Sequence, residues 1–332
     1  MKKKIALLSI VLALVMAITA FAGCTTSSKK EDDNKVLIYC ASSDDTMKLL
    51  EKEFKAKFPD YDIQVEYMTS GDLAAKMAAE GKNTSCDIVF DLDYGYINKS
   101  EPYLHDLSSY DLSKFVEESI LPSKKIVPNC RNGGCIAINE KMLKEKGIAV
   151  PASYADLIKP EYKGLISMPN PKSSGTGYMF YKSLVNKWGE DEALAYFDAL
   201  EKNVLHFTSS GSGPVNDIVQ GEAAIGFAMT AQTVAEINKG ASIKIHFFEE
   251  GSPYSFYGAG IIEGKQDKKA VKEVFDFFYD TLIEKNSRLN FPEKIFKDID
   301  IEIENYPEDI KYADMAGNTV EEKERLLEKW KF

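Results

Sequence analysis

Four short stretches of serine, threonine and glycine stand between the end of an expected strand and the start of an expected helix. They are Ser42-Ser43, Thr69-Ser70-Gly71, Ser173-Ser174-Gly175-Thr176-Gly177 and Ser210-Gly211-Ser212-Gly213-Pro214. Each places hydroxyl groups beside the first N–H groups of a helix, which have no partner within that helix. The helix dipole favours negative charge at the same place, so each stretch can bind an anion or simply cap its own helix. Ligand binding is favoured if several of these stretches face one cleft.

Carboxylates and a phenol form a second group of candidates. Asp91 and Asp93 end an apolar stretch that reads as a strand, and Tyr94 follows directly. Two carboxylates at a strand end suit a metal ion, an ammonium group or sugar hydroxyls, although acids in such places are also common as solvated caps. Tyr257 lies at the return to the last expected strand and is a candidate to line a cleft.

Patterns for covalent or metal-assisted catalysis are absent from the sequence. It contains no G-x-S-x-G and no H-E-x-x-H, and Ser173–Gly177 lacks the Gly-Lys-Ser/Thr ending of a Walker loop. The three histidines lie far apart along the chain, and the cysteine spacing does not match a zinc site. A secreted phosphate-ester hydrolase using Asp91 or Asp93 is an alternative that lacks the nucleophile, base or metal set it would need. We therefore expect a protein without enzyme activity, metal or cofactor.

The overall composition is that of a globular protein. The chain has 332 residues, enough for two domains, with 44% hydrophobic and 28% charged residues. These values exclude collagen, extended disorder and a multi-span membrane protein. The formal net charge is −11, and arginine occurs only at Arg131, Arg288 and Arg325. A nucleic-acid partner is therefore not expected.

The N-terminus has the features of a secretory signal. Met1–Lys4 contains three lysines, and Ile5–Ala22 follows without a charge. The ending Phe21-Ala22-Gly23-Cys24 resembles the lipobox of bacterial lipoproteins, although phenylalanine stands where leucine is usual. This resemblance implies removal of residues 1–23, lipid attachment to the Cys24 sulfur, and a flexible tether over residues 24–34. A plain secretory signal, with Cys24 incidental, is the alternative.

Four further cysteines remain in the mature chain, Cys40, Cys86, Cys130 and Cys135. Outside the cytoplasm they could form disulfides. The stretch between Cys130 and Cys135 contains Asn-Gly-Gly, which turns easily, so these two could close a small loop. Four free, mostly buried thiols is the interpretation that we favour.

The rest of the chain alternates between strand and helix patterns. Lys35–Cys40 and Asp87–Asp91 are apolar runs, and Ile63, Val65 and Tyr67 alternate with polar residues, as in strands. Helical patterns separate these segments, and a β-α-β-α-β order predicts a parallel sheet. Further strands are expected at Gly164–Met168, Ala223–Ala228, Ile243–Phe248 and Gly258–Ile262, and further helices at Tyr178–Trp188, Ala193–Leu200, Pro214–Val219, Val271–Leu282 and along the tail beyond Leu282.

Several separate motifs resemble the extracellular solute-binding proteins of ABC transporters. They include Pro160-Glu161-Tyr162-Lys163-Gly164, Pro169-Asn170-Pro171-Lys172-Ser173-Ser174-Gly175-Thr176 and Gly221-Glu222-Ala223-Ala224-Ile225-Gly226. The opening LIYCASSDDT…LLEKEFKAKFPD and the closing GAGIIEGKQDKKAVKEVFDFF match as well, so the likeness covers most of residues 35–285 in the family's order. The subgroup that the chain resembles contains ferric-iron, 2-aminoethylphosphonate and sugar-phosphate binders.

The resemblance implies an α/β, two-lobed fold of the second periplasmic-binding-protein type. Each lobe would be a mostly parallel sheet flanked by helices, with strands crossing between the lobes near Val127–Ile138 and Phe247–Tyr257. The expected division is lobe 1 over 35–130, lobe 2 over 131–255, and a return to lobe 1 with C-terminal helices over 256–332. Such a protein closes on a small molecule and delivers it to an ABC transporter permease. We expect a monomer held at the cell membrane by its lipid anchor.

The same resemblance bears on the ligand. Iron binders of this family usually carry adjacent tyrosines shortly after the Gly-Glu-Ala-Ala strand, where this chain has Phe227-Ala228-Met229-Thr230-Ala231-Gln232. Hydroxyls at helix starts suit a tetrahedral oxyanion, so a phosphorylated or phosphonate-bearing solute is the favoured prediction. Ferric iron, thiamine and other small anions or amines are alternatives, and an iron site would then use Tyr94, Tyr178 and Tyr257.

The ligand-binding residues predicted from the sequence come from both lobes. They are Ser42, Ser43, Thr69, Ser70, Asp91, Asp93, Tyr94, Ser173, Ser174, Gly175, Thr176, Ser210, Gly211, Ser212, Gly213, Thr230 and Tyr257. The hydroxyls would hold the oxyanion, and the Asp91 and Asp93 carboxylates would meet an amine or sugar hydroxyls at the other end of the ligand.

Overall fold

The structure is a computed structural model that describes residues 33–332. The expected signal segment 1–23, the expected lipidation site Cys24 and nearly all of the expected tether lie outside the described residues. No helix in the described part of the chain is long and apolar enough to cross a membrane.

The first lobe is built on the predicted β-α-β-α-β unit. β1 (Lys35–Cys40) pairs in parallel with β2 (Asp62–Tyr67) on one side and with β3 (Ile88–Asp93) on the other. The connecting helices are α3 (Asp44–Lys57) and α4 (Ser70–Glu80), and both start at predicted hydroxyl-rich stretches. After β3 the chain makes a 3₁₀ turn (Tyr94–Tyr96) and a short helix, α5 (Ile97–Ser100). The parallel order puts the C-terminal ends of all three strands at the edge that faces the second lobe.

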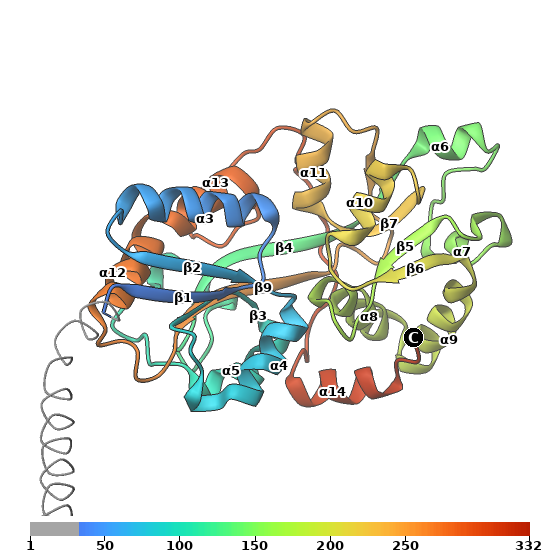
Figure 1. The fold of residues 1–332 in the computed structure, drawn as a ribbon. Helices are drawn as coiled ribbons and strands as arrows, with labels where there is room; N and C mark the ends of the chain where they lie inside the picture. The colour runs from blue at the N-terminus through green and yellow to red at the C-terminus, as the bar shows by residue number, and fades with distance from the viewer. Residues whose placement is uncertain (1–32) are drawn as a thin grey trace, which may run out of the picture.

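Two strands run from one lobe into the other (Figure 1). β4 (Val127–Ile138) pairs antiparallel with β9 (Tyr254–Ile261) along its first half. Its second half pairs with β7 (Ile225–Met229) and β8 (Lys244–His246), while β9 also pairs with β3. The sheet therefore runs β2-β1-β3-β9-β4-β7-β5-β6 through the whole molecule. The first crossing strand has the predicted bounds, and the second begins at Tyr254, inside the range expected for it.

The second lobe completes the sheet with β5 (Ile166–Pro169) between β6 (Val204–Thr208) and β7, parallel to both. Four helices cover it: α8 (Gly175–Trp188), α9 (Glu190–Leu200), α10 (Gly213–Gln220) and α11 (Thr230–Asn238). Two short helices, α6 (Glu140–Glu145) and α7 (Tyr154–Leu157), lie at its outer end (Figure 1). The sequence patterns gave no bounds for β6, implied only as the strand before Ser210, and they missed α11. They placed the start of α8 at Tyr178, although the helix already begins at Gly175.

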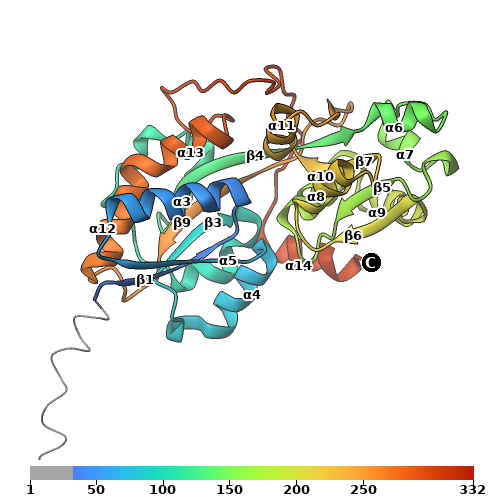
Figure 2. The same cartoon turned by 45° about the horizontal axis from the view of Figure 1, so that its top comes forward.

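The C-terminal part differs from the expectation of one continuous helical tail. α12 (Lys269–Phe277), a π-helical turn (Phe278–Leu282) and α13 (Ile283–Asn290) pack on the first lobe, but residues 291–319 contain no helix and only isolated bridges. The last helix, α14 (Val320–Lys329), then packs on the second lobe, where Leu326 and Trp330 join its hydrophobic core. Residues 256–332 therefore contribute to both lobes, whereas the expected division assigned the return segment to the first (Figure 2).

The cysteines do not form the small disulfide loop that was considered. Cys130 and Cys135 both lie in β4, where the Asn-Gly-Gly stretch is extended and does not turn. All four cysteines of the described chain are buried and free, which confirms the favoured interpretation.

Candidate ligand-binding cleft

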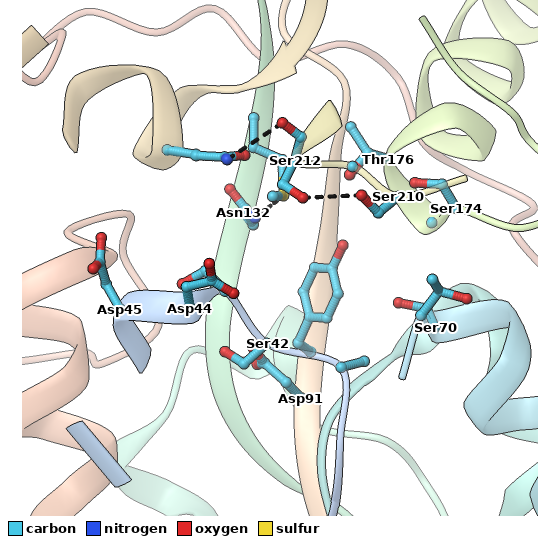
Figure 3. Close-up of a pocket in the computed structure, with 18 of the residues that line it drawn as sticks. Ser42, Asp44, Asp45, Ser70, Asp91, Asn132, Ser174, Thr176, Ser210 and Ser212 are labelled. Atoms are coloured by element: carbon cyan, nitrogen blue, oxygen red, sulfur yellow. Dashed lines mark hydrogen bonds between the residues drawn. The ribbon is translucent and has the colours of Figure 1, made fainter. Parts of the chain in front are cut away.

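A cleft lies between the two lobes, in front of the crossing strands (Figure 3). Its walls include most of the residues predicted from the sequence. These are Ser42, Ser43, Thr69, Ser70, Asp91, Ser174, Gly175, Thr176, Ser210, Gly211, Ser212 and Tyr257. The structure thus brings all four hydroxyl-rich stretches to one place, which is the condition under which they favour a ligand over simple capping.

The four stretches present four helix starts to the cleft, two from each lobe. Ser43 and Thr69 cap α3 and α4, accepting from the N–H groups of Thr46 (3.5 Å) and Asp72 (3.2 Å). Ser174 caps α8 across 3.5 Å to the N–H of Gly177. These caps satisfy one N–H group per helix, and a helix start has several, so donors remain for a bound anion.

α10 starts differently, because its N-cap residue Ser212 makes no side-chain cap. Its hydroxyl instead shares a hydrogen bond with that of Ser210, at 2.9 Å (Figure 3). Both residues line the cleft, and the α10 start has no side-chain cap. An anion between α8 and α10 would meet hydroxyl and N–H donors from both helices.

Asp91 occupies a β-bulge, with a register shift between Val89 and Leu92 and a left-handed backbone, φ 58°. The residue is 3% exposed and lines the cleft. One oxygen, Oδ1, accepts from the Asn129 amide and the Cys130 thiol. Burial raises the pKa of the Asp91 carboxyl, and the Asn129 hydrogen bond only partly opposes that effect. A strained, buried acid at a cleft is typical of a functional position.

Asp93 does not line the cleft but stands between the lobes. Its Oδ1 accepts from the Gly95 N–H (2.8 Å) and from the Ser255 hydroxyl (2.6 Å). Its Oδ2 packs so tightly against Gly175, the first residue of α8, that any Cβ there would overlap it. The lobes touch again where the Tyr96 hydroxyl donates to the carbonyl of Pro171, at 3.3 Å. This edge of the cleft is therefore closed in the structure.

Other predicted residues lie next to the cleft without lining it. The Tyr94 hydroxyl donates to the Ser119 carbonyl (2.8 Å), and the Ser173 hydroxyl donates to that of Ser209 (2.9 Å). Gly213 lies inside the start of α10, where it packs on Thr208. Thr230, the first residue of α11, is fully buried, and its hydroxyl has no partner among the described residues.

The sequence reasoning missed a set of polar residues on the cleft walls. Asn132 and Gln232 each have a buried side-chain oxygen without a hydrogen-bond partner in the described chain. Asp44, Asp45, Lys48, Glu236 and Lys239 also line the cleft. Asp44 and Asp45 are first-turn acids of α3, a place where acids commonly serve only the helix, and Asn132 lies in the middle of a strand, where no sequence pattern marks it.

Acidic residues and hydroxyl-bearing residues gather at opposite ends of the cleft. Asp44 and Asp45 lie at one end, and Ser70, Ser174 and Thr176 lie at the other (Figure 3). Each lysine of the lining already pairs with acids: Lys239 lies 2.9 Å from Glu236 and 3.5 Å from Asp45, and Lys48 lies 3.9 Å from Asp45. No arginine is among the described residues that line the cleft. An anion there would be held by neutral donors.

The family of the chain follows from comparison with known proteins. Residues 99–312 match the family described as bacterial extracellular solute-binding protein. The chain belongs to this family. Membership makes it a solute-binding protein of the ABC-importer type, acting outside the cytoplasm and binding a small molecule. Proteins of this kind are typically not enzymes, and no sign of a hydrolase accompanies Asp91 or Asp93.

Individual relatives and solved structures agree with this assignment. An uncharacterized protein of Haemophilus influenzae is 28% identical over 269 residues, 77% of this chain and 76% of that protein. The periplasmic binding protein AfuA of Actinobacillus pleuropneumoniae, solved with fructose 6-phosphate, superposes with a TM-score of 0.80 at 23% identity, covering 89% of this chain and 97% of AfuA. Iron-bound HitA of Pseudomonas aeruginosa superposes with a TM-score of 0.72 at 16% identity, covering 89% of this chain and 98% of HitA. The two structures establish the two-lobed fold, and they differ in ligand.

Replacement of Asp91 by asparagine should stabilise the empty protein at neutral pH. The raised pKa means that folding favours the protonated carboxyl, so ionisation costs stability as the pH rises from the ordinary aspartate value through the raised one. Asparagine cannot ionise and tolerates the left-handed backbone at this position. Urea unfolding of Asp91→Asn and wild type from pH 3 to pH 8 should show no difference at the acid end and an advantage for the variant that grows with pH. An advantage that is constant over the range would contradict the account.

Replacement of Gly175 by alanine should keep the protein folded but hinder closure. The new methyl group would overlap the Asp93 carboxylate of the opposite lobe, and opening the cleft relieves this overlap. We expect at least about a tenfold loss of solute affinity. The unfolding midpoint should be no lower than that of wild type, because alanine is a better helix former than glycine. Lys187→Ala, at an exposed position of α8, is the matched control. Equal affinities of Gly175→Ala and wild type would show that the lobes do not close in this way.

Proposed function

We propose that this protein captures a small phosphorylated or phosphonate-bearing solute between its lobes and delivers it to a membrane permease. The observation that carries the proposal is the convergence of four helix starts and their hydroxyls on one cleft. A phosphate or phosphonate group has several oxygens that can accept from such donors at once. Fructose 6-phosphate in the AfuA structure supports a ligand of this class.

The opposite end of the cleft suits a group rich in hydrogen-bond donors. Asp44 and Asp45 place two carboxylates there (Figure 3), and elsewhere on the cleft walls the Asp91 carboxylate and the unpartnered side-chain oxygens of Asn132 and Gln232 add further acceptors. An ammonium group or sugar hydroxyls would satisfy them, whereas a second anionic group would be repelled. The proposed ligand is therefore dipolar, with its oxyanion towards Ser174 and Thr176 and its donors towards the acids.

Each lobe contributes part of the proposed binding site. Lobe 1 (35–130) brings Ser43, Thr69 and Asp91, and lobe 2 (131–255) brings Ser174 and Ser212. A solute that contacts both sets favours the closed form by its differential affinity, because neither lobe alone offers the full set of donors. Residues 256–332 return to the first lobe and end on the second.

Ferric iron is the second candidate, because HitA was solved with iron. Of the three tyrosines predicted as alternative iron ligands, only Tyr257 lines the cleft, and the Tyr94 hydroxyl donates to a carbonyl. Burial raises the pKa of Tyr94, Tyr178 and Tyr257, which disfavours the phenolates that a ferric ion needs. The residue types of the cleft therefore support an oxyanion better than a hard metal ion.

Each hydrogen bond that the double variant Ser174→Ala, Thr176→Val removes from a phosphorylated ligand should weaken binding roughly ten- to a hundredfold, because one hydrogen bond to a charged group contributes about 1.5–3 kcal/mol. Calorimetry would compare 2-aminoethylphosphonate, hexose phosphates, thiamine phosphate and ferric citrate on the variant and on wild type. Ser153→Ala is the matched control, since Ser153 caps α7 in the same manner (3.2 Å to the Asp156 N–H) but lies outside the cleft. Binding of ferric citrate alone, or unchanged affinity of the double variant, would reject the oxyanion site.

Attachment to the membrane through Cys24 is proposed from the Ala22-Gly23-Cys24 ending. Cells fed a clickable fatty acid should label the wild-type protein and the Thr25→Ala control, but not Cys24→Ala. The physical reason is that the acyl chains have no other attachment point in this account. Equal labelling of Cys24→Ala would place the lipid elsewhere.

A further inference from the structure

The C-terminal helix α14 is fixed to the second lobe. Leu326 and Trp330 are buried in its core, and the Trp330 ring lies 5.3 Å from that of Tyr181 and 5.1 Å from that of Phe197. The Tyr181 hydroxyl donates to the carbonyl of Leu326 at 3.2 Å. α14 should therefore move with the second lobe when the cleft opens.

The same helix sends one lysine into the first lobe. Lys323 is only 3% exposed, and its ammonium lies over the ring of Tyr96 and 4.2 Å from the ring centre of Tyr178. Tyr96 belongs to the turn after β3 in the first lobe, whereas Tyr178 belongs to α8 in the second. Figures 1 and 2 both show α14 at this junction, between α4 and α5 on one side and α8 on the other. The buried position of Lys323 thus exists only while the lobes are together.

The ammonium group of Lys323 has no hydrogen-bond or ion-pair partner in the described part of the chain. The Asp93 carboxylate attracts this ammonium but makes no hydrogen bond to it, and its Oδ1 accepts from Gly95 and Ser255. The faces of two tyrosine rings attract a cation, yet this attraction is smaller than the hydration that an unpaired ammonium loses on burial. Burial lowers the pKa of Lys323 well below its usual value, which also indicates that the charged form is disfavoured at this position.

The polar contacts that favour closure are weaker, and at this edge they include the hydrogen bond from Tyr96 to the Pro171 carbonyl, 3.3 Å long. The ion pair between Lys99 of α5 and Glu324 of α14, at 3.0 Å, is exposed to solvent, and such pairs contribute little. The pair between Lys239 and Asp45 at the far edge is also exposed. In the empty protein, the burial of Lys323 therefore outweighs these ion pairs and disfavours the closed form.

We propose that Lys323 opposes closure of the empty cleft, so that the closed form is populated only when a solute contributes its binding energy. Opening moves α14 away from Tyr96 and returns the ammonium to water. Closure buries it again, at a cost that a bound solute offsets. This inference rests on the proposed solute-binding function only in requiring that the lobes open, and it does not depend on the class of solute.

The test compares the empty wild-type protein with Lys323→Met, which keeps an unbranched chain of similar length but removes the charge. Small-angle X-ray scattering of both proteins, freed of solute by unfolding, dialysis and refolding, should give a smaller radius of gyration for the variant. We expect the ratio of closed to open molecules to rise by about tenfold or more. Lys331→Met is the control, because Lys331 is exposed and pairs with Asp198 within the second lobe.

A second uncharged variant, Lys323→Gln, must shift the radius of gyration in the same direction, which keeps the test valid if methionine packs poorly. An unchanged radius for both variants would overturn the proposal, and a larger radius would show that Lys323 holds the lobes together instead. Because no solute enters this measurement, its failure would leave the proposed binding function standing. A failure of that function in calorimetry would likewise leave this result intact.

Discussion

The structure depends on the pairing of β4 and β9, the two strands that pass between the lobes. β4 changes partners at Gly133 and Gly134: before this point it pairs with β9, and after it with β7 and β8. A side chain at Gly134 would meet Phe180, Met179 and Pro253 at 2.8–2.9 Å, so only glycine allows the close approach of strand and helix here. The relative placement of the lobes, and therefore of every residue in the cleft, follows from this junction.

The C-terminal segment reinforces the same junction. Glu293 accepts from the Gly133 N–H (2.8 Å) and from the hydroxyls of Tyr306 and Tyr312 (2.6 Å each), and burial raises the pKa of its carboxyl. The main chain of Ser252, just before β9, also bonds to that of Lys311 and Ala313. Residues 291–319 thus tie both crossing strands before α14 reaches the second lobe. Residues 291–319 therefore stabilise the pairing of β4 and β9 through these contacts.

Much of the cleft could be predicted because the direction of the strands fixes the edge of the sheet at which the following loops lie. Parallel strands bring their C-terminal ends to one edge, so the stretches around Ser43, Thr69, Ser174 and Ser212 had to meet if the lobes faced each other. The sequence predicts Asp91 and Asp93 together in the site at a strand end, but the structure has a bulge at Asp91, where Asp91 lines the cleft and Asp93 packs against Gly175. A bulge leaves no clear mark in a single sequence.

The parts that could not be predicted depend on long-range packing. Asn132 and Gln232 lie within regular elements, and only the meeting of the lobes makes them cleft residues. The sequence of residues 291–319 shows neither helical nor strand periodicity, because this segment is held by contacts with distant strands and not by contacts with its own neighbours.

The central claim is that neutral donors at helix starts, those around Ser174 and Thr176 above all, hold an oxyanion of the solute. The most direct measurement is phosphorus-31 NMR and mass spectrometry of the solute released by denaturing the mature protein after isolation from its native cells. The account predicts one phosphorus-containing solute in near-stoichiometric amount. A phosphorus-free solute, or a ferric ion released in the same amount, would contradict it.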